Sequence, residues 1–517
     1  MDFVSGGTIR KLWSDRVTTS GDDLFLIYES AEGDEAAFSY EEFNDRIDRT
    51  ARALHDELGV RKGDHVAIHL PNCPQYLQAW FALMKLGAVT VHSSTQHTPR
   101  EIEHTLDIAD AELLITEPDF EDDIRAGIEN TGIDEIVWAR EEKIEEERDL
   151  QFSSLVEGAS ADLPEVELAT EDHAQILFTS GTTSMPKPAL HTHANLLSGG
   201  ERIAKHLALQ PSDRNLSSLP LYHGSPQILS VFCSLTAGAT AISYEEFKAS
   251  KFMDQVRKHR ATVTTCIGTQ VRALMATTEE DTDGDNDLRH AFTAFNVPQD
   301  VKEGFEDRFD VTLLNSYGCT EALILFTLAP LYNERKWPSI GRPLQGRDLY
   351  ILDDDGNEVE TGERGEIAVD GKRGRTVLKR YYNMPEKTEE AFTEEGWFLT
   401  GDFGRFDEDG FLYFVDRKKN IIETRGENVS EAEVEEVLEE HTGIEEVAAV
   451  GIPHEIYGEV VKVHVKLLDE SLTEADVREY AEENLASFKI PEEIEFVDEF
   501  PRTSIGKIEK SELRGEK

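Results

Sequence analysis

The sequence predicts an α/β protein with a large N-terminal domain of doubly wound α/β subdomains plus a small β-barrel or antiparallel sheet, and a small, mobile α+β C-terminal domain. Three patterns support this prediction. Helices alternate with apolar strands over residues 40–116 and again from residue 175, short strands between Gly and Asp turns fill residues 340–414, and a helix–strand–strand–helix unit follows residue 430. Strands that alternate with helices of this length are typical of parallel sheets.

The first alternating series begins with a helix over 40–57, predicted from the spacing of its apolar residues. The elements expected after it are a strand at 65–70, a helix at 75–86, a strand at 88–92, a helix at 100–109 and a strand at 112–116. Residues 117–170 are strongly acidic and carry few long apolar patterns, so we expect them to run over the surface.

The second series begins with an apolar strand at 175–178, and residues 228–243 are typical of a buried helix followed by a strand. In the C-terminal unit we expect a helix at 430–440, strands at 447–452 and 460–468, and a helix at 474–485. Three consecutive basic residues mark the boundary between the two parts. The predicted domains are 1–416 and 420–517, joined by a hinge at 417–419.

The chain is unusually acidic, with 104 acidic and 52 basic residues among 517 and a net charge of −52. Proteins that bind nucleic acids or anionic membranes carry the opposite sign, so the composition disfavours both classes. The acidic residues are spread over the whole chain, and their repulsion is tolerable where salt shortens the screening length to about 3 Å. This haloarchaeal-type composition predicts a cytoplasmic protein of a salt-loving organism; an acidic mesophile protein is the alternative.

The cysteines and histidines suggest neither a disulfide scaffold nor a metal centre. Four cysteines lie far apart without a C-x-x-C pair, which fits a reducing compartment; they are Cys73, Cys233, Cys266 and Cys319. His191 and His193 lack a third ligand at suitable spacing, so a strand end and a helix cap are expected there. The N-terminus lacks the apolar core of a signal peptide, and the longest weakly polar run is too short to span a bilayer.

A Ser/Thr/Gly-rich loop that ends in a lysine follows the strand at 175–178. Its small residues expose backbone N–H groups and hydroxyls that can surround phosphates, and the lysine adds a positive charge. It is not the G-x-x-x-x-G-K-[ST] loop, and alone such a turn is more often an ordinary loop. The residues of this candidate phosphate site are Thr179, Ser180, Gly181, Thr182, Thr183 and Lys187.

Three further segments follow this loop in a fixed order. They are the NSYGCTE run at 315–321, a Thr-Gly-Asp turn ending at Asp402, and a PRTSIGKI run at 501–508 that contains Lys507. Each is weak evidence alone. Together with the Ser/Thr/Gly loop they resemble the adenylate-forming superfamily of acyl-CoA synthetases, luciferases and peptide-synthetase adenylation domains, and the resemblance covers essentially the whole chain.

The resemblance implies how the nucleotide is held. It places Tyr317 against the adenine, Thr320 near the α-phosphate, and Glu321 with Thr182 as magnesium ligands. Magnesium is a hard cation that accepts one or two carboxylates and keeps most of its waters. Asp402 would accept both ribose hydroxyls, which requires two acceptor oxygens. The remaining nucleotide contacts that the resemblance implies are Asn315, Ser316, Gly318 and Arg417.

The resemblance also implies roles for residues of the C-terminal part. Lys419 would be the hinge, and Arg425 and Gly426 would line the tunnel for the pantetheine arm of CoA. Lys507 would bridge the oxygen of the acid and the phosphate. His223 occupies the position of the gate between acid pocket and thiol tunnel; a buried core histidine is the alternative. The catalytic residues implied are Lys507, Glu321, His223 and Lys187.

The chain departs from the superfamily pattern at four places. Ser184 and Pro188 stand where Gly is usual, and Pro188 removes a backbone donor and restricts Lys187 to extended geometry. Glu423 replaces a lysine that is frequent in related ligases. The stretch that begins at Phe295 replaces a Gly-rich adenine loop. Pro188 is the strongest sequence argument against full activity.

The predicted function is an ATP-dependent, AMP-forming acyl-CoA ligase that needs Mg²⁺ and uses CoA as co-substrate. By resemblance, the carboxylate attacks the α-phosphate and expels pyrophosphate. The C-terminal domain then rotates about Lys419, and the CoA thiol attacks the acyl-adenylate.

Several stretches resemble the carnitine/crotonobetaine-CoA ligase branch, including WPSIGR at 337–342 and GENVS at 426–430. A betaine acid would favour an aromatic cage, with Tyr222, Phe232 and Phe295 as candidates. A short- or medium-chain acid of fatty acid metabolism is equally consistent. Two alternatives stay open: loading of a carrier protein, and a catalytically impaired nucleotide-binding homologue. A homodimer is also left open.

Overall fold

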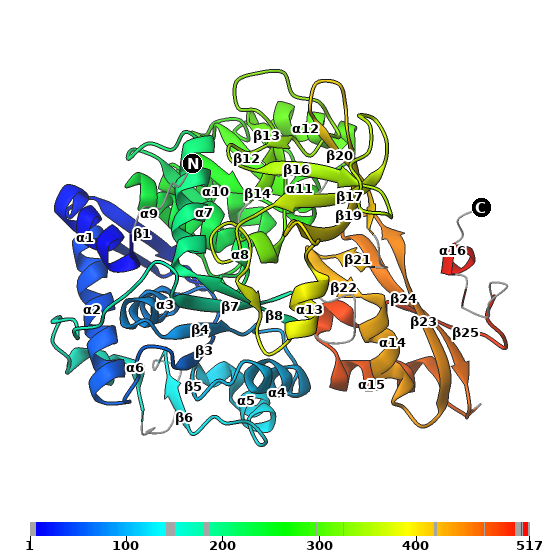
Figure 1. Ribbon diagram of the computed structural model, residues 1–517, viewed down its shortest axis with the longest axis horizontal. Helices are drawn as coiled ribbons and strands as arrows, with labels where there is room; N and C mark the ends of the chain where they lie inside the picture. Colours follow the sequence, from blue (N-terminus) through cyan, green and yellow to red (C-terminus); the bar gives the residue numbers. More distant parts are fainter. Residues whose placement is uncertain are drawn as a thin grey trace.

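The computed structural model describes residues 7–140, 150–179, 186–294, 297–323, 325–417, 421–469, 471–501, 508 and 510–514, with backbone only at 416, 417, 432 and 511. Two large sheets and one small sheet make up the N-terminal part, and a five-stranded sheet forms the C-terminal part beside it (Figure 1). The predicted α/β class with a large N-terminal and a small C-terminal domain is confirmed. The boundary at 417–419 stays a prediction, because 418 and 419 lie outside the described residues.

A seven-stranded sheet carries the first alternating series. In sheet order its strands are β18 (Arg380–Tyr381), β8 (Lys187–Thr192), β7 (His173–Thr179), β4 (Val89–His92), β3 (His65–His69), β5 (Leu113–Thr116) and β6 (Glu135–Trp138). The strands from β7 to β6 are parallel, whereas β8 and β18 are antiparallel to their neighbours. Strands β3, β4 and β5 are buried along their whole length, as expected for a parallel sheet covered on both faces.

A nine-stranded sheet carries most of the second series, but the predicted first strand of that series is β7 and lies in the seven-stranded sheet. In sheet order its strands are β15 (Arg342–Pro343), β14 (Leu325–Leu328), β13 (Thr312–Gly318), β12 (His290–Ala294), β11 (Val263–Thr265), β9 (Arg214–Ser217), β10 (Thr240–Tyr244), β1 (Leu24–Glu29) and β2 (Glu35–Ser39). The strands from β13 to β1 are parallel, and antiparallel strands close both edges.

Two smaller antiparallel sheets follow. The first is an open sheet of β16 (Asp348–Leu352), β17 (Gly365–Asp370), β19 (Phe398–Phe406) and β20 (Leu412–Arg417), so the described strands form a sheet and not a closed barrel. The C-terminal sheet contains β21 (Ile421–Thr424), β22 (Glu427–Ser430), β23 (Ile444–His454), β24 (Gly458–Leu467) and β25 (Glu493–Phe496). Its strands are antiparallel except for the β24–β25 pair.

Helices fill the connections between the strands. The first of them along the chain are α1 (Ile9–Ser20), α2 (Tyr40–Asp56), α3 (Pro74–Leu86), α4 (Pro99–Ile108), α5 (Glu121–Gly127), α6 (Phe152–Glu157) and α7 (His193–His206). The later helices of the N-terminal part are α8 (Gly224–Pro226), α9 (Cys233–Ala237), α10 (Ala249–His259), α11 (Gly268–Met275), α12 (Gln299–Phe309) and α13 (Pro385–Glu390). Those of the C-terminal part are α14 (Glu431–Glu439), α15 (Glu474–Asn484) and α16 (Lys510–Leu513).

Local sequence explains where several helices begin. Ser39 and Thr98 form capping boxes at α2 and α4, in which each hydroxyl accepts the backbone N–H three residues on and the Glu at that position returns a bond to the cap. Thr192 caps α7 in the same way, with Asn195 as partner. The predicted strand end and helix cap around His191 and His193 is therefore confirmed.

The largest core cluster joins the first helices to both large sheets. Trp13, Phe25 and Phe81 pack edge to face at its centre, with ring centroids 4.9 to 6.3 Å apart. A separate cluster around Val434, Val463 and other residues fills the C-terminal part. The two parts therefore have their own apolar cores, which suits parts that move relative to each other.

The structure departs from two of the sequence-based expectations. The prediction that residues 117–170 run over the surface is wrong in part, because β6 joins the sheet and Val137, Ala139 and Phe152 are buried. The acidic residues around these few apolar ones hid the strand. The helix and strand predicted at 228–243 are present, but the chain forms a π-helical turn at Gln227–Phe232 before α9.

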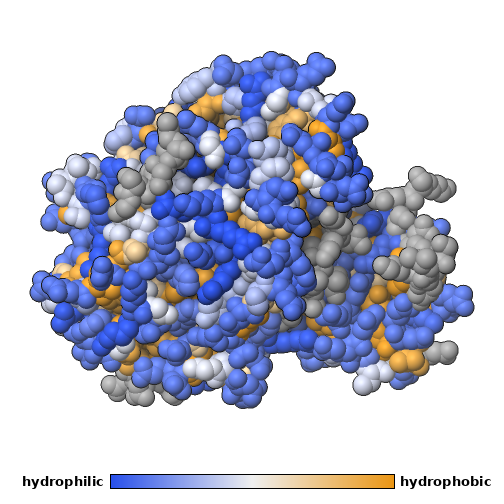
Figure 2. Space-filling model, viewed as in Figure 1, coloured by the Kyte–Doolittle hydropathy of each residue, from blue (hydrophilic) through white to orange (hydrophobic). Residues whose placement is uncertain are grey.

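The face shown in Figure 2 is mostly hydrophilic, with scattered apolar patches. This agrees with the net charge of −52. In the described part of the chain, no helix is both long and apolar enough to cross a membrane. Three of the four cysteines are buried as free thiols, and Cys319 is half-buried.

Candidate active site

The candidate phosphate loop connects the antiparallel strands β7 and β8, so its two ends are held together by the sheet. Thr179 and Lys187 lie opposite each other in this register, at the mouth of the loop. Pro188 takes a regular place in β8, where its carbonyl accepts the N–H of Tyr382 at 2.8 Å. The proline therefore fits the strand. Ser180, Gly181, Thr182, Thr183 and Ser184 lie outside the described residues.

The segment 315–321 runs from β13 into a 3₁₀ turn at Thr320–Ala322. The turn lifts Glu321 out of the sheet, and its side chain is half-buried. Asn315 and Ser316 are buried and bond neighbouring backbone: Asn315 donates to the Ser339 carbonyl and Ser316 to the Thr293 carbonyl. These two residues therefore brace the strand that presents the turn.

A tyrosine that the sequence patterns missed connects Glu321 to Lys187. The Tyr381 hydroxyl donates to Glu321 Oε1 at 2.7 Å and accepts from Lys187 Nζ at 3.4 Å. The ammonium also lies 4.5 Å from the centre of the Tyr381 ring. Burial, together with the Glu321 carboxylate, raises the pKa of Tyr381 far above its ordinary value, so the hydroxyl stays protonated and donates. Tyr381 is on β18, which pairs with β8, and the sheet therefore places it beside Lys187.

Asp402 lies next to Tyr317, as the predicted nucleotide site requires. The Tyr317 hydroxyl donates to Asp402 Oδ2 at 2.6 Å, and both side chains are buried. Burial and the Asp402 carboxylate raise the pKa of Tyr317 well above its ordinary value. The backbone of Arg417 lies opposite Asp402 in the β19–β20 register. The fold thus brings Tyr317, Asp402 and the end of β20 together.

Arg425 and Gly426 form the two-residue turn of the β21–β22 hairpin. Both have left-handed backbone, with φ of 54° and 86°, as a tight hairpin turn of this length requires. A methyl group on Gly426 would overlap the side chain of Ile267, which precedes α11 of the N-terminal part. The Arg425 guanidinium pairs with Glu492 at 2.7 Å and lies over the Tyr457 ring. The hairpin tip therefore rests directly on the N-terminal part.

The next residue of this hairpin, Glu427, reaches His223. Its Oε1 lies 2.8 Å from His223 Nε2, across the two parts of the molecule. Burial works to lower the pKa of His223, but the Glu427 carboxylate outweighs it, and the pKa lies above its ordinary value. His223 also contacts the ring of Tyr222. His223 therefore makes a contact that depends on the placement of the C-terminal part, and its role as a gate stays a prediction.

One residue expected in the site lies in the core, and three others lie outside the described residues. Phe232 is fully buried among Trp80 and Phe81, so it packs the core and cannot form an aromatic cage. Phe295, Lys419 and Lys507 lie outside the described residues. Lys507 is three residues before α16, which Lys510 anchors to Glu431 and Glu435 of α14. In Figure 1, α16 lies at the outer edge of the C-terminal part, away from the N-terminal sheets.

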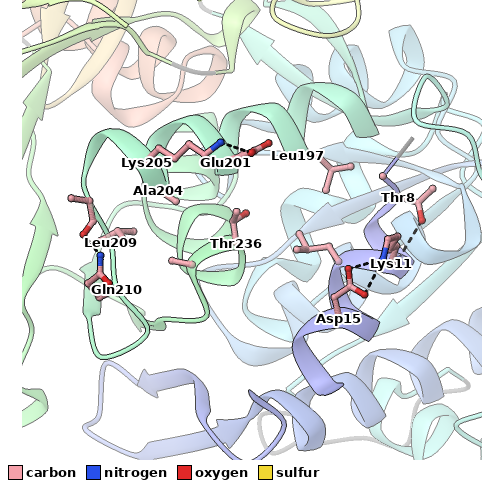
Figure 3. A pocket seen from close by; sticks show the side chains of 14 residues that line it. Thr8, Lys11, Asp15, Leu197, Glu201, Ala204, Lys205, Leu209, Gln210 and Thr236 are labelled. Carbon is pink, nitrogen blue, oxygen red and sulfur yellow. Dashed lines mark hydrogen bonds and ion pairs between the residues drawn. The ribbon is translucent and has the colours of Figure 1, made fainter. Parts of the chain in front are cut away.

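A hollow of about 640 Å³ lies apart from all of these residues (Figure 3). It is formed between α1 and α7, with ion pairs Lys11–Asp15 and Glu201–Lys205 along it. None of the described site residues named above lines it. It is therefore not the candidate nucleotide site.

Comparison with known proteins assigns the chain to a family. The family model for AMP-binding enzyme matches residues 13–382, and the model for the AMP-binding enzyme C-terminal domain matches residues 433–507. The chain belongs to the AMP-binding enzyme family. The crotonobetaine/carnitine–CoA ligase of Salmonella paratyphi A is 39% identical over 519 residues, which cover 99% of this chain and 100% of that protein. The predicted AMP-forming acyl-CoA synthetase of the adenylate-forming superfamily is confirmed.

Two solved structures show how far the likeness extends in space. A double mutant of o-succinylbenzoate CoA synthetase (MenE) from Bacillus subtilis, bound with the product analogue OSB-NCoA, matches with a TM-score of 0.85 at 27% identity, over 99% of both chains. ATP-bound MatB from Rhodopseudomonas palustris matches with a TM-score of 0.70 at 28% identity, over 98% of both chains.

Proposed function

We propose that this ligase forms the CoA thioester of a small carboxylic acid in two half-reactions, each served by a different placement of the C-terminal domain. The observation that carries this proposal is the seating of the β21–β22 hairpin. Its tip contacts Ile267 and His223, while α16, three residues beyond Lys507, lies on the far edge (Figure 1). A C-terminal domain in this position would serve the thiol step, and it would have to turn for the adenylation step.

In the first half-reaction, the oxygen of the acid attacks the α-phosphorus of ATP and pyrophosphate leaves. Negative groups meet there, so positioned positive charge supplies most of the stabilisation. Lys187 supplies it at the mouth of the loop, and Tyr381 holds Lys187 near Glu321. Glu321 fits Mg²⁺, which would offset part of the phosphate charge; Thr182 is the second proposed ligand.

The nucleoside would be held by Tyr317 and Asp402. In the described arrangement the Tyr317 hydroxyl donates its hydrogen bond to the Asp402 carboxylate. We propose that the ribose hydroxyls take over the Asp402 carboxylate when ATP binds, with Arg417 alongside on β20. Asn315, Ser316, Gly318 and Thr320 keep their proposed places along the nucleotide.

In the second half-reaction, the CoA thiol attacks the acyl carbon and AMP leaves. The hairpin residues Arg425 and Gly426 would line the path of the pantetheine arm, next to His223. The TM-scores of two solved structures support this assignment. The chain matches the synthetase that holds a CoA product analogue with a TM-score of 0.85 and the ATP-bound one with 0.70, at almost equal sequence identity.

For the acid, we propose a small quaternary-ammonium carboxylate such as crotonobetaine or carnitine. The full-length 39% identity to crotonobetaine/carnitine–CoA ligase supports this choice. Tyr222, buried beside His223, keeps its proposed place as an aromatic contact for the cation. A short- or medium-chain fatty acid is the competing substrate class.

The net charge of −52 further supports a cytoplasmic protein that works in concentrated salt. The test of function therefore uses the purified chain with ATP and Mg²⁺ in high KCl, across crotonobetaine, carnitine and short- to medium-chain fatty acids, with and without CoA. Turnover to AMP, pyrophosphate and a betainyl-CoA thioester, only with CoA present, is the expected result. Turnover with a fatty acid alone would reassign the substrate. Bound ATP without pyrophosphate release for any acid would favour the impaired homologue.

A further inference from the structure

A buried lysine joins the two parts of the molecule. Lys489, in a 3₁₀ turn of the C-terminal part, has its ammonium 2.5 Å from Glu101 Oε1 and 2.7 Å from Glu433 Oε1. Glu101 belongs to α4 of the N-terminal part, whereas Glu433 belongs to α14. The exposed fractions of the three side chains are 5%, 2% and 3%. We call these three residues the interdomain charge cluster.

The N-terminal member of the cluster is held rigidly. Glu101 Oε2 accepts both the N–H and the hydroxyl of Thr98, as part of the capping box of α4. The residue before it, Arg100, makes a two-pronged pair with Glu440, the C-cap residue of α14, at 2.6 and 2.8 Å. That second pair is largely exposed. One short helix end therefore contacts the C-terminal domain through one buried and one exposed ion pair.

The buried cluster can hold together only while the domains keep this placement. Two carboxylates face one ammonium, so removing the ammonium would leave two negative charges close together and out of water. Breaking a buried pair from one side is costly because the remaining charge has no counter-charge. When the C-terminal domain turns away, Glu101 separates from Lys489, and water can reach all three groups.

We propose that Lys489 is a positioning residue that holds the C-terminal domain in the thiol-step arrangement, through its contact with Glu101. This inference rests on the proposed two-arrangement mechanism. Lys489 touches no reacting atom in it. It sets how much of the enzyme has the hairpin seated against Ile267 and His223, and so how fast the acyl-adenylate meets the thiol.

The test compares the two half-reactions in Lys489→Met. We expect thioester formation from supplied acyl-adenylate and saturating CoA to slow at least about tenfold. Acid-dependent pyrophosphate exchange should stay within about twofold of wild type. Lys85→Met is the matched control, because Lys85 is an equally buried lysine paired with Asp48 inside the N-terminal part. It should lower stability without changing the ratio of the two rates.

Two further variants separate positioning from folding. Glu101→Gln lies outside the C-terminal domain and keeps an oxygen for the Thr98 cap; it should slow the thiol step by about threefold or more. Lys489→Arg should recover most of the wild-type ratio. Equal slowing of both half-reactions, or no slowing of either, in Lys489→Met and Glu101→Gln would overturn the proposal.

A measurement of domain placement that needs no catalysis tests this proposal separately from the proposed function. Fluorescent dyes on Asp15→Cys of α1 and Glu479→Cys of α15 report the placement of the domains by energy transfer, with no substrate present. Wild type should show one dominant population with the distance expected from the described arrangement. Lys489→Met should shift a substantial fraction to a second distance, and Lys85→Met should not. An unchanged distribution in Lys489→Met contradicts the proposal even if no acid is ever activated.

Discussion

Replacing Tyr381 with phenylalanine tests the connection between Lys187 and Glu321. The change removes one oxygen, which donates to Glu321 at 2.7 Å and accepts from Lys187 at 3.4 Å, and leaves the buried ring in place. A hydrogen bond to a charged group contributes about 1.5–3 kcal/mol, or roughly 10- to 140-fold. Glu321 is half-buried, so water replaces part of the loss, and we expect about a tenfold slower adenylation.

The assay is acid-dependent pyrophosphate exchange over a range of Mg²⁺ concentrations. Because Tyr381 orients the proposed magnesium ligand, Tyr381→Phe should also need more Mg²⁺ for half-maximal rate, while its thermal unfolding stays close to wild type. Tyr382→Phe is the matched control: the neighbouring hydroxyl donates to Asp110 at the surface. Wild-type exchange and wild-type Mg²⁺ dependence in Tyr381→Phe would refute the role of this tyrosine.

Three other predictions concern the hairpin and the surface charge. Gly426→Ala should slow thioester formation by about tenfold or more and spare pyrophosphate exchange, because its methyl group would overlap Ile267. Gly396→Ala controls for backbone strain, because Gly396 has a similar φ and open space around it. Equal slowing of thioester formation in the two variants would contradict this prediction. The raised pKa of His223 means that its pair with Glu427 stabilises the fold below the ordinary histidine pKa and is lost as pH rises through the raised value. The melting temperature of Glu427→Gln should therefore lie below that of wild type at pH 6 and equal it at pH 9. A difference in melting temperature that is the same at both pH values would rule this out. With a net charge of −52, the melting temperature should rise between 0.1 and 2 M KCl, and a flat profile would argue against salt adaptation.

Local signals predicted much of the fold. Alternation of helices and strands indicated both large sheets, and the helix starts predicted at residues 40 and 100 lie within one residue of the observed starts of α2 and α4. The expectation for residues 117–170 failed because the apolar content of β6 is short and surrounded by acidic residues. The π-helical turn at Gln227–Phe232 was also missed, since its apolar residues fit an ordinary buried helix equally well.

The site was predicted only where its residues lie in recognisable runs. Tyr317 and Asp402, from separate runs, do meet. Tyr381 escaped because its partners Lys187 and Glu321 lie far away in the chain, and only the pairing of β18 with β8 brings them together. Glu427 and Lys489 escaped for a similar reason. Their partners His223 and Glu101 belong to the other domain, and nothing in the local pattern encodes that placement.

The central claim is that one site performs two half-reactions in two placements of the C-terminal domain. The most direct measurement is a single-turnover comparison of both half-reactions in Lys507→Ala. We predict that acyl-adenylate formation falls by about 10²–10³-fold, because a positioned positive charge is lost, whereas thioester formation from supplied acyl-adenylate stays near wild type. Equal loss of both steps would contradict the account.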